Sequence, residues 1–339
     1  MKPRVEVDFN AEDRRAFRKK LPEYCSQTNE FLLNHARSGL LLALQSLSLP
    51  RGSKVGVMVY NCHTVMNAVA QAGCDVVFID VDDSLRIDRN DLEKKMDGLK
   101  ALIVTHLFGI VNDIQAIQKQ YPQLDIIEDC AHAFGKEIIG DFGVYSIGQG
   151  KLPSLGDGGI LRVNNPKYAE TVSALYEKLP EYSRSDEKKL CWKLYLTDLV
   201  HNRLVYGLIT SRLKQRKKPQ SGKEFIEMRK MSRGIRAMLA LRRDAVAEQI
   251  KSRLENAEKE TKVLNDNPLV SKVLCGINAF MLVVRSSNVE PLKSHYAQRG
   301  IETATHFAKS LFWAQSFGYK KDCPNAEKLV HELLMIPVY

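Results

Sequence analysis

The chain has 339 residues, of which 44% are apolar, so it can bury a large core and form more than one structural unit. It carries 50 Lys and Arg against 40 Asp and Glu, a formal net charge of +10. No run of about eighteen apolar residues is free of charges, and the charged first residues lack the apolar core of a signal peptide. These features exclude a simple membrane span, and we expect a cytoplasmic protein.

The cysteines and the charge distribution narrow the function classes further. The seven cysteines are scattered and never form C-x-x-C, which argues against a disulfide framework and a structural zinc site. Much of the positive excess lies in the run 212–223. Such a run is either a solvated loop or a segment that attracts an anion, which is then a phosphorylated substrate or an anionic membrane surface. Nucleic acid is not expected, because no aromatic residues interleave with the charges.

The first half of the chain alternates helical and strand patterns. Residues 31–48 carry an apolar helical face, and residues 54–60 form the first expected strand. Strands and helices then alternate, with strands expected at 75–81, 101–105, 125–129, 144–147 and 159–163, and helices at 64–72, 91–96 and 113–119. Near-continuous apolar strands separated by helices are typical of a parallel sheet that is buried on both faces.

The second half is mainly helical. Residues 166–212 include the apolar segment Leu190–Val200, for which a packed helix is favoured over a membrane-facing amphipathic one, because the polar face has few Lys and Arg. A long helix over 231–264 is expected to lead into an α/β unit with a strand at 278–284 and a helix at 291–299. We therefore predict a large domain, 1–235, and a small domain, 236–339.

Several common signatures are absent from the sequence. Leu152 follows Gly150-Lys151, so the NTPase phosphate loop is missing, and no G-x-G-x-x-G follows the first strand. Neither H-E-x-x-H nor G-x-S-x-G occurs, and the eight histidines are isolated, so no metal site is predicted.

Two segments carry the chemistry. The strand 125–129 ends in Glu128-Asp129, at the place where an open parallel sheet presents its ligand crevice. Lys151 lies in a glycine-rich loop between the two short strands 144–147 and 159–163. Neighbouring strand ends can thus bring a carboxylate and an amine to one pocket. Without the surrounding pattern, Asp129 is equally well explained as the N-cap of a helix, and Lys151 is better explained as an ordinary solvent-exposed lysine.

The pattern around these two residues resembles the DegT/DnrJ/EryC1/StrS family of sugar aminotransferases, which use pyridoxal 5'-phosphate (PLP). The family motifs V-I-E-D-x-A-(Q/H)-A-x-G, G-D-x-G-x-x-S-x-x-x-x-K and G-(E/D)-G-G match at Glu128, Asp129, Ala131, His132, Ala133, Gly135, Gly143, Ser146, Lys151, Gly156, Asp157, Gly158 and Gly159. Weaker similarities cover most of the chain in the same order, at 36–40, 60–63, 106–109, 299–306, 323–327 and 336–339. The resemblance implies an α/β fold of the aspartate aminotransferase type (fold type I), with a mostly parallel, helix-covered sheet and a smaller C-terminal α/β domain.

The resemblance also implies roles for individual residues. Lys151 binds PLP through a Schiff base and then moves protons, and Asp129 keeps the ring nitrogen protonated. The other implied site residues are Ser38, Gly39 and Ser146 at the phosphate, His132 near the ring, Cys62 and His63 at the ring-stacking position, and His306 on the substrate side. The alternatives are a plain helical serine at 38 and a core histidine at 132.

Three departures from the family pattern stand out. The family Asn that reaches the phosphate from a partner subunit has no clear counterpart at 228–232, and residues 147–150 lack the usual aromatic residue or His. The chain also stops at Tyr339, where relatives continue into a last helix. We therefore expect the dimer-interface part of the site, or the end of the small domain, to be unusual.

The function implied is transfer of an amino group, with glutamate as the expected donor, to a nucleotide-linked keto-sugar by a homodimer, in amino-sugar or polysaccharide biosynthesis. One alternative is a PLP-dependent sugar dehydratase of the same fold, although such relatives replace the lysine with histidine or add an iron–sulfur cluster. The other is a catalytically weak paralogue with a binding or regulatory role.

Overall fold

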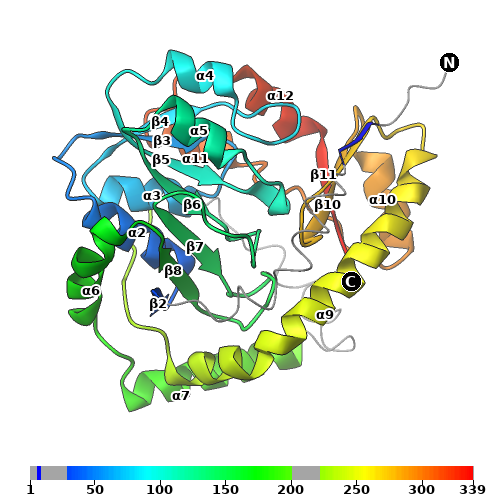
Figure 1. The fold of residues 1–339 in the computed structure, drawn as a ribbon. Helices are drawn as coiled ribbons and strands as arrows, with labels where there is room; N and C mark the ends of the chain where they lie inside the picture. The colour runs from blue at the N-terminus through cyan, green and yellow to red at the C-terminus, as the bar shows by residue number, and fades with distance from the viewer. Residues whose placement is uncertain (1–5, 9–28, 201–221, 339) are drawn as a thin grey trace.

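The computed structural model describes residues 6–8, 29–200 and 222–338. The larger of its two sheets has seven strands in the order β2-β8-β7-β6-β5-β3-β4 (Figure 1). Pairing is parallel from β4 through β3, β5 and β6 to β7, and antiparallel at β7–β8 and β8–β2. The strand bounds are β2 Glu30–Leu33, β3 Lys54–Met58, β4 Asp75–Ile79, β5 Leu99–Thr105, β6 Asp125–Asp129, β7 Phe142–Ser146 and β8 Gly159–Val163.

Helices cover both faces of this sheet, because the strands are apolar on both sides. On β5, Ala101 and Ile103 face one apolar cluster, and Leu102 and Val104 face the other. This alternation is the two-residue period of a strand that is buried on both faces. The helices of this part are α2 Ala36–Ser46, α3 His63–Gln71, α4 Arg89–Lys94, η1 Leu107–Gly109, α5 Ile114–Gln120, η2 Pro166–Tyr168, α6 Ala169–Glu177 and α7 Arg184–Val200.

The smaller sheet has four strands in the order β1-β9-β10-β11. Its strands are β1 Glu6–Asp8, β9 Lys272–Cys275, β10 Met281–Arg285 and β11 Leu333–Pro337, and its helices are α10 Glu290–Gln298, α11 Ser310–Gln315 and α12 Pro324–Glu332. The long helix α9, Arg233–Asn265, runs from the first sheet to the second (Figure 1). Residues 6–8 thus belong to the smaller sheet, and the boundary at 235/236, within the first turn of α9, stays a prediction.

One expected element is wrong in part. The helix predicted over 31–48 begins only at Ala36, and Glu30–Leu33 form β2. A short apolar run has no decisive period, and here pairing decides, since Leu32 lies opposite Ile160 of β8.

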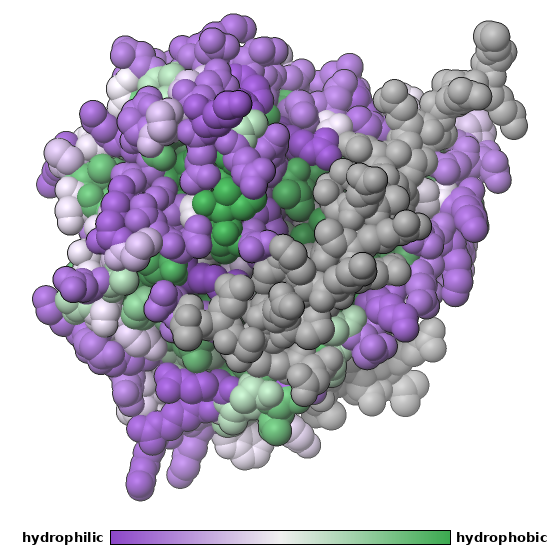
Figure 2. Space-filling view, viewed as in Figure 1, coloured by the Kyte–Doolittle hydropathy of each residue, from purple (hydrophilic) through white to green (hydrophobic). Residues whose placement is uncertain are grey.

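The helix α7 packs less completely than the sequence predicts. Leu190 is buried and Leu194 half-buried, but Trp192, Tyr195 and Leu196 are 65%, 62% and 53% exposed. The lower edge of the molecule, where α7 lies beside the start of α9, accordingly shows apolar and pale side chains beside hydrophilic ones (Figure 2). None of the described helices combines the length and the apolar character that are needed to cross a membrane.

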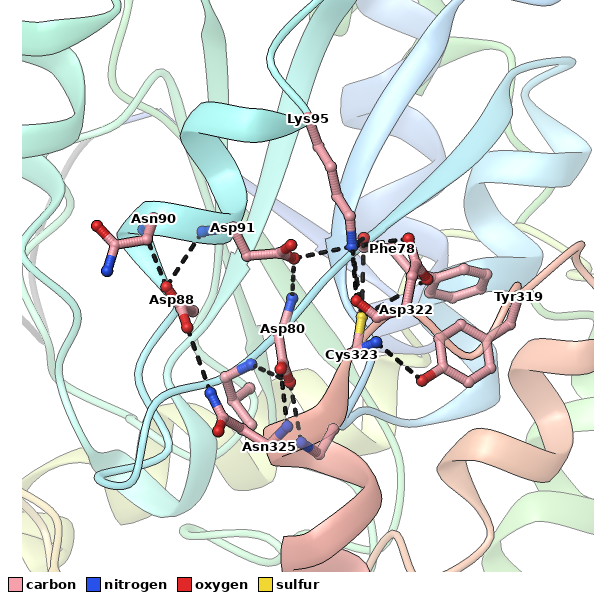
Figure 3. Close-up of polar contacts among 12 residues, drawn as sticks. Phe78, Asp80, Asp88, Asn90, Asp91, Lys95, Tyr319, Asp322, Cys323 and Asn325 are labelled. Atoms are coloured by element: carbon pink, nitrogen blue, oxygen red, sulfur yellow. Dashed lines mark hydrogen bonds and ion pairs between the residues drawn. The ribbon is translucent and has the colours of Figure 1, made fainter.

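A polar network ties α12 to the larger sheet (Figure 3). Asp80, at the end of β4, accepts hydrogen bonds from the main-chain N–H groups of Asn325 (2.8 Å) and Ala326 (2.9 Å). Its own N–H donates to Asp91, which also binds the Lys95 ammonium at 2.9 Å. Lys95 in turn contacts Asp322 at 2.9 Å, just before α12. A carboxylate on the larger sheet thus satisfies donors at the N-terminus of α12 that have no partner within the helix.

We expect Asp80→Ala to lower the free energy of unfolding by about 2 kcal/mol, because the buried Ala326 N–H and the half-buried Asn325 N–H lose their acceptor. Hydrogen exchange of the amides in 324–332 should accelerate. The control Asp113→Ala removes the exposed N-cap of α5, should cost about 1 kcal/mol, and should leave exchange in α12 unchanged. If the amides of α12 exchanged at the same rate in Asp80→Ala and Asp113→Ala, Asp80 would not be what holds the start of α12.

Candidate active site

A cavity of about 270 Å³, here called the central cavity, opens at the carboxyl ends of β5, β6 and β7. The starts of α2 and α3 and the loop between β7 and β8 complete its wall. Its volume is near the lower end of the range of about 300–1,000 Å³ found for small-ligand pockets. It brings together five of the predicted site residues, namely Cys62, Asp129, His132, Ser146 and Lys151.

Asp129 ends β6 and is 4% exposed. Its carboxylate accepts hydrogen bonds from the Ala131 N–H at 3.0 Å and from the Thr105 hydroxyl at 3.2 Å. Burial raises the pKa of Asp129, and these two hydrogen bonds and the charge of Lys151 only partly oppose it. Among the described residues no cation lies within ion-pair distance of this carboxylate, so the site can still stabilise a positive charge on a ligand.

Lys151 lies in the loop from Ile147 to Gly158, and its N–H closes a turn onto the Gly148 carbonyl at 3.1 Å. The side chain is half-buried, and its Nζ lies 5.7 Å from the centre of the Phe280 ring. Burial lowers the pKa of Lys151, although Cys62 and Asp129 act in the opposite direction. A lower pKa increases the fraction of neutral amine, which is the nucleophilic form.

His132 is a neutral, stacked ring. Its Nδ1 accepts a hydrogen bond from the Phe108 N–H at 3.2 Å, and its ring lies 4.4 Å from that of Phe280, only 14° from parallel. Burial, with the charges of Lys151 and His306, lowers its pKa well below the ordinary value. His132 thus lines the central cavity, and Phe280, from the C-terminal part of the chain, covers one face of its ring. Its predicted contact with a cofactor ring stays a prediction.

Ser38 and Gly39 lie in α2 behind the wall of the central cavity. The Ser38 hydroxyl donates to the Asn34 side chain at 2.8 Å. A side chain at position 39 would meet Val144 of β7 at 3.2 Å, so glycine here lets α2 pack closely against the sheet. The residues at this helix start that do line the central cavity are His35, Ala36 and Arg37.

Gly159 fixes the position of that helix start. A Cβ at this position would lie 2.3 Å from the Ala36 nitrogen, so only glycine allows β8 to pass so close to α2. The adjoining Gly158 has a φ of +112°, which glycine adopts without strain. The G-D-G-G match in the sequence is thus explained by a close backbone contact.

His63 and His306 lie beside the central cavity rather than in its wall. The His63 ring packs against Trp313 and its Nε2 lies 3.3 Å from Glu224. The His306 carbonyl accepts a hydrogen bond from the Tyr60 hydroxyl at 2.8 Å. Burial and the charge of Lys151 lower the pKa of His306.

Sequence reasoning missed several residues of this site. Thr105 had a usable signal, because it ends β5 directly opposite Asp129 in the parallel register. Asn61 also lines the central cavity and lies within the similarity at 60–63. Phe307 lines the central cavity and Phe280 caps Lys151, but no local pattern marks these two side chains, because the larger sheet and the C-terminal part meet only in the folded chain.

Glu128, the neighbour of Asp129, is fully buried in a separate network. Its carboxylate binds the Lys136 ammonium at 2.6 Å and His106 at 2.8 Å, and it accepts the N–H groups of Ile139 and Gly140. Burial alone would raise its pKa, but the hydrogen bonds and charges of His106 and Lys136 lower it to about 2. This network stabilises the loop that follows β6 and holds Asp129 in place.

We expect Glu128→Gln to lower the free energy of unfolding by about 3–5 kcal/mol, because Lys136 would stay buried without its anion. Since the folded pKa is depressed, Glu128 stabilises the fold at neutral pH, and about 3 kcal/mol of this is lost as the pH falls from about 4.5 towards 2. Urea unfolding across this pH range tests both statements. The free energy of unfolding of Glu128→Gln should no longer fall by this amount between pH 4.5 and 2, whereas that of the exposed Glu170→Gln should fall as in the wild type.

Comparison with known proteins places the chain in context. The model of the DegT/DnrJ/EryC1/StrS aminotransferase family matches residues 9–197 and 227–339. An uncharacterized protein of Methanocaldococcus jannaschii is 26% identical over 91% of this chain and 80% of its own length. A pleiotropic regulatory protein of Geobacillus stearothermophilus is 26% identical over 88% of this chain and 76% of its own. The GDP-perosamine synthase of Vibrio cholerae is also 26% identical, but over only 44% of each chain.

Solved structures share the fold at low sequence identity. A DegT DnrJ EryC1 StrS aminotransferase from Brucella abortus superposes with a TM-score of 0.69 at 22% identity, over 96% of this chain and 85% of that one. The GDP-4-keto-6-deoxy-D-mannose-3-dehydratase of Escherichia coli, with bound hydrated PLP, gives 0.70 at 15% identity, over 100% and 95%. The predicted PLP-dependent transferase fold, with its mostly parallel sheet, is therefore confirmed.

Proposed function

Because the chain belongs to the DegT/DnrJ/EryC1/StrS aminotransferase family, we propose that it is a PLP-dependent aminotransferase acting on a nucleotide-linked keto-sugar. The observation that carries the proposal is that the Lys151 amine and the Asp129 carboxylate line the same central cavity. When bound, PLP supplies a cationic ring that draws electrons from the carbon bearing the amino group. The binding, orientation and proton transfers fall to the residues of the chain.

Lys151 is the covalent attachment point and the proton carrier in this proposal. Its amine belongs to a half-buried side chain with a lowered pKa, so it would be able to hold the cofactor covalently. Among the described residues it has no hydrogen-bond or ion-pair partner that it would have to leave. When it is not bonded to the cofactor, the Lys151 amine would be placed to take a proton at one carbon and return it at another.

Asp129 fits the nitrogen end of the ring. Burial raises its pKa, and a protonated ring nitrogen would supply the cation that the carboxylate lacks among the described residues. A charged hydrogen bond from Asp129 at that position would keep the nitrogen protonated. Hydrogen bonds from the Thr105 hydroxyl and the Ala131 N–H hold the carboxylate in place.

For the phosphate we propose the start of α2 together with Ser146. Ala36 and Arg37 line the central cavity at a helix N-terminus, where the dipole favours an anion. This assignment lies next to the predicted Ser38 and Gly39, which stay predictions. Cys62 and His132 lie on the cavity wall, where they can contact the ring, and His306 is kept as a substrate-side residue.

The substrate and donor follow from the relatives and from the charge. The GDP-perosamine synthase and the GDP-keto-sugar dehydratase named above have nucleotide sugars in their names, and the net charge of +10 favours a diphosphate. Glutamate is the proposed donor, and a cytoplasmic homodimer the proposed form. Lys151 favours transamination over the dehydratase alternative, whereas the similarity to a regulatory protein keeps a binding role as the second candidate.

We expect Lys151→Ala to abolish the visible absorbance of the PLP-loaded protein and to slow amination by a factor on the order of 10³ or more. The assay is mass spectrometry of UDP-, GDP- and dTDP-linked keto-sugars incubated with protein, PLP and glutamate. Lys189→Ala, on the exposed face of α7, serves as the control. If the wild type and Lys151→Ala gave the same spectrum, and neither produced amino-sugar, the enzyme assignment would be wrong.

We expect Asp129→Asn to weaken PLP binding about ten- to a hundredfold, because an amide gives the ring nitrogen a hydrogen bond without the charge. Fluorescence titration with PLP measures the affinity. The exposed Asp97→Asn should bind like the wild type. If Asp129→Asn bound PLP as tightly as the wild type, the proposed contact between this carboxylate and the ring nitrogen would be wrong.

A further inference from the structure

The Cys62 thiol occupies an unusual position for a free cysteine. It is the residue before the first turn of α3, with extended backbone angles (φ −73°, ψ 139°), and it lines the central cavity. Its own N–H donates to the Asn61 side chain at 2.8 Å, which fixes the residue at the helix start. The N–H groups of a first helical turn carry partial positive charge, which favours an anionic sulfur at this end.

Two side chains on the same turn contact the sulfur. The Thr64 hydroxyl donates to Sγ at 3.2 Å, and His63 Nδ1 lies 3.9 Å from it. On the other side of the imidazole, Nε2 lies 3.3 Å from a carboxylate oxygen of Glu224. The thiol, the imidazole and the carboxylate thus form a continuous series of polar contacts. When His63 donates its Nε2–H to Glu224, its Nδ1 is free to accept the thiol proton.

Residues from several elements hold His63 and Glu224 in place. Trp313 of α11 packs against the His63 ring, with ring centres 4.8 Å apart. The Glu224 N–H donates to Asn67 of α3 at 2.8 Å, and Arg37 of α2 lies 3.9 Å from the Glu224 carboxylate. The position of His63 is therefore set by contacts with side chains from several elements of this chain.

The electrostatics of the site agree with this geometry. Burial alone would raise the pKa of the Cys62 thiol, but the hydrogen bonds from His63 and Thr64 lower it below its ordinary value. The hydrogen bond to Cys62, opposed by burial and supported by Glu224, raises the pKa of His63. Lys151, across the central cavity, adds a further positive charge that interacts with Cys62.

We propose that Cys62 is a covalent modification site of the central cavity, which takes α,β-unsaturated carbonyl compounds with His63 as its proton acceptor and donor. The Cys62 proton passes to His63 Nδ1, and Sγ forms a bond to the β-carbon of the electrophile. The electron pair of the C=C bond moves to the α-carbon and there takes up the proton from His63. The product is a thioether that contains every atom of both reactants, so no oxidant or leaving group is needed.

The adduct has a consequence for the cavity. A group attached to Sγ extends into the same space of about 270 Å³ that Asp129 and Lys151 line. Cys62 modification and PLP binding should therefore exclude each other. This part of the inference rests on the proposed function, whereas the reactivity of Cys62 does not.

The test uses N-ethylmaleimide as the probe on the PLP-free chain, with Cys191 as an internal reference. Cys191 is an exposed thiol on α7, whereas the described cysteines Cys74, Cys130, Cys275 and Cys323 are buried. Mass spectrometry of digested samples gives the labelling rate of each cysteine between about pH 5.5 and 8. We expect Cys62 to react about tenfold faster than Cys191 near pH 6, with a difference that narrows as the pH rises.

Two variants separate reactivity from simple access. His63→Gln and Glu224→Gln should slow labelling of Cys62 about tenfold and about threefold, and leave Cys191 unchanged. Equal rates at Cys62 and Cys191 near pH 6, or an unaltered Cys62 rate in His63→Gln with an unchanged melting temperature, would overturn the proposal.

Preloading with PLP should protect Cys62 but not Cys191, and labelled protein should no longer develop the visible absorbance of bound PLP. Fast labelling without this protection would refute the shared cavity. If the unlabelled protein bound no PLP at all, the proposed function would fail while the labelling result stood.

Discussion

The parallel register of β5, β6 and β7 is the constraint on which the rest of the site depends. Thr105 lies opposite Asp129, and Asp129 lies opposite Val144, so three strands end at the same edge of the sheet. In an open parallel sheet this edge is where the crevice opens, because the chain leaves each strand towards a covering helix. The starts of α2 and α3 and the loop carrying Lys151 gather there for the same reason.

The two adjacent carboxylates of β6, Glu128 and Asp129, are both buried but lie in different surroundings. Successive side chains of a strand point to opposite faces, so Glu128 and Asp129 enter different surroundings. Glu128 is neutralised by Lys136 and hydrogen-bonded by His106, and its pKa falls. Asp129 has no such partner within residues 6–8, 29–200 and 222–338, and burial raises its pKa. A buried carboxylate without a cation is costly for the fold alone, which is why it marks a place for a charged ligand.

The C-terminal part of the chain closes the site that the larger sheet opens. Phe280 and Phe307 pack near Lys151 and His132, and Trp313 covers His63. These aromatic side chains exclude water from groups whose shifted pKa values depend on burial. The same part of the chain is also attached to the larger sheet where Asp80 accepts hydrogen bonds from the start of α12 (Figure 3).

By itself the sequence determined the alternation of strands and helices between residues 54 and 163, the family, and the prediction that Asp129 and Lys151 share one pocket, since apolar periodicity and the spaced E-D and G-D-G-G motifs are local properties. Tertiary structure decided what depends on contacts between distant segments. Pairing with β8 turned residues 30–33 into a strand, and close packing put Ala36 rather than Ser38 at the cavity wall. The Cys62–His63–Glu224 chain joins residues far apart in sequence, and no periodicity records such a meeting, because it arises only when the segment before α9 packs against α3.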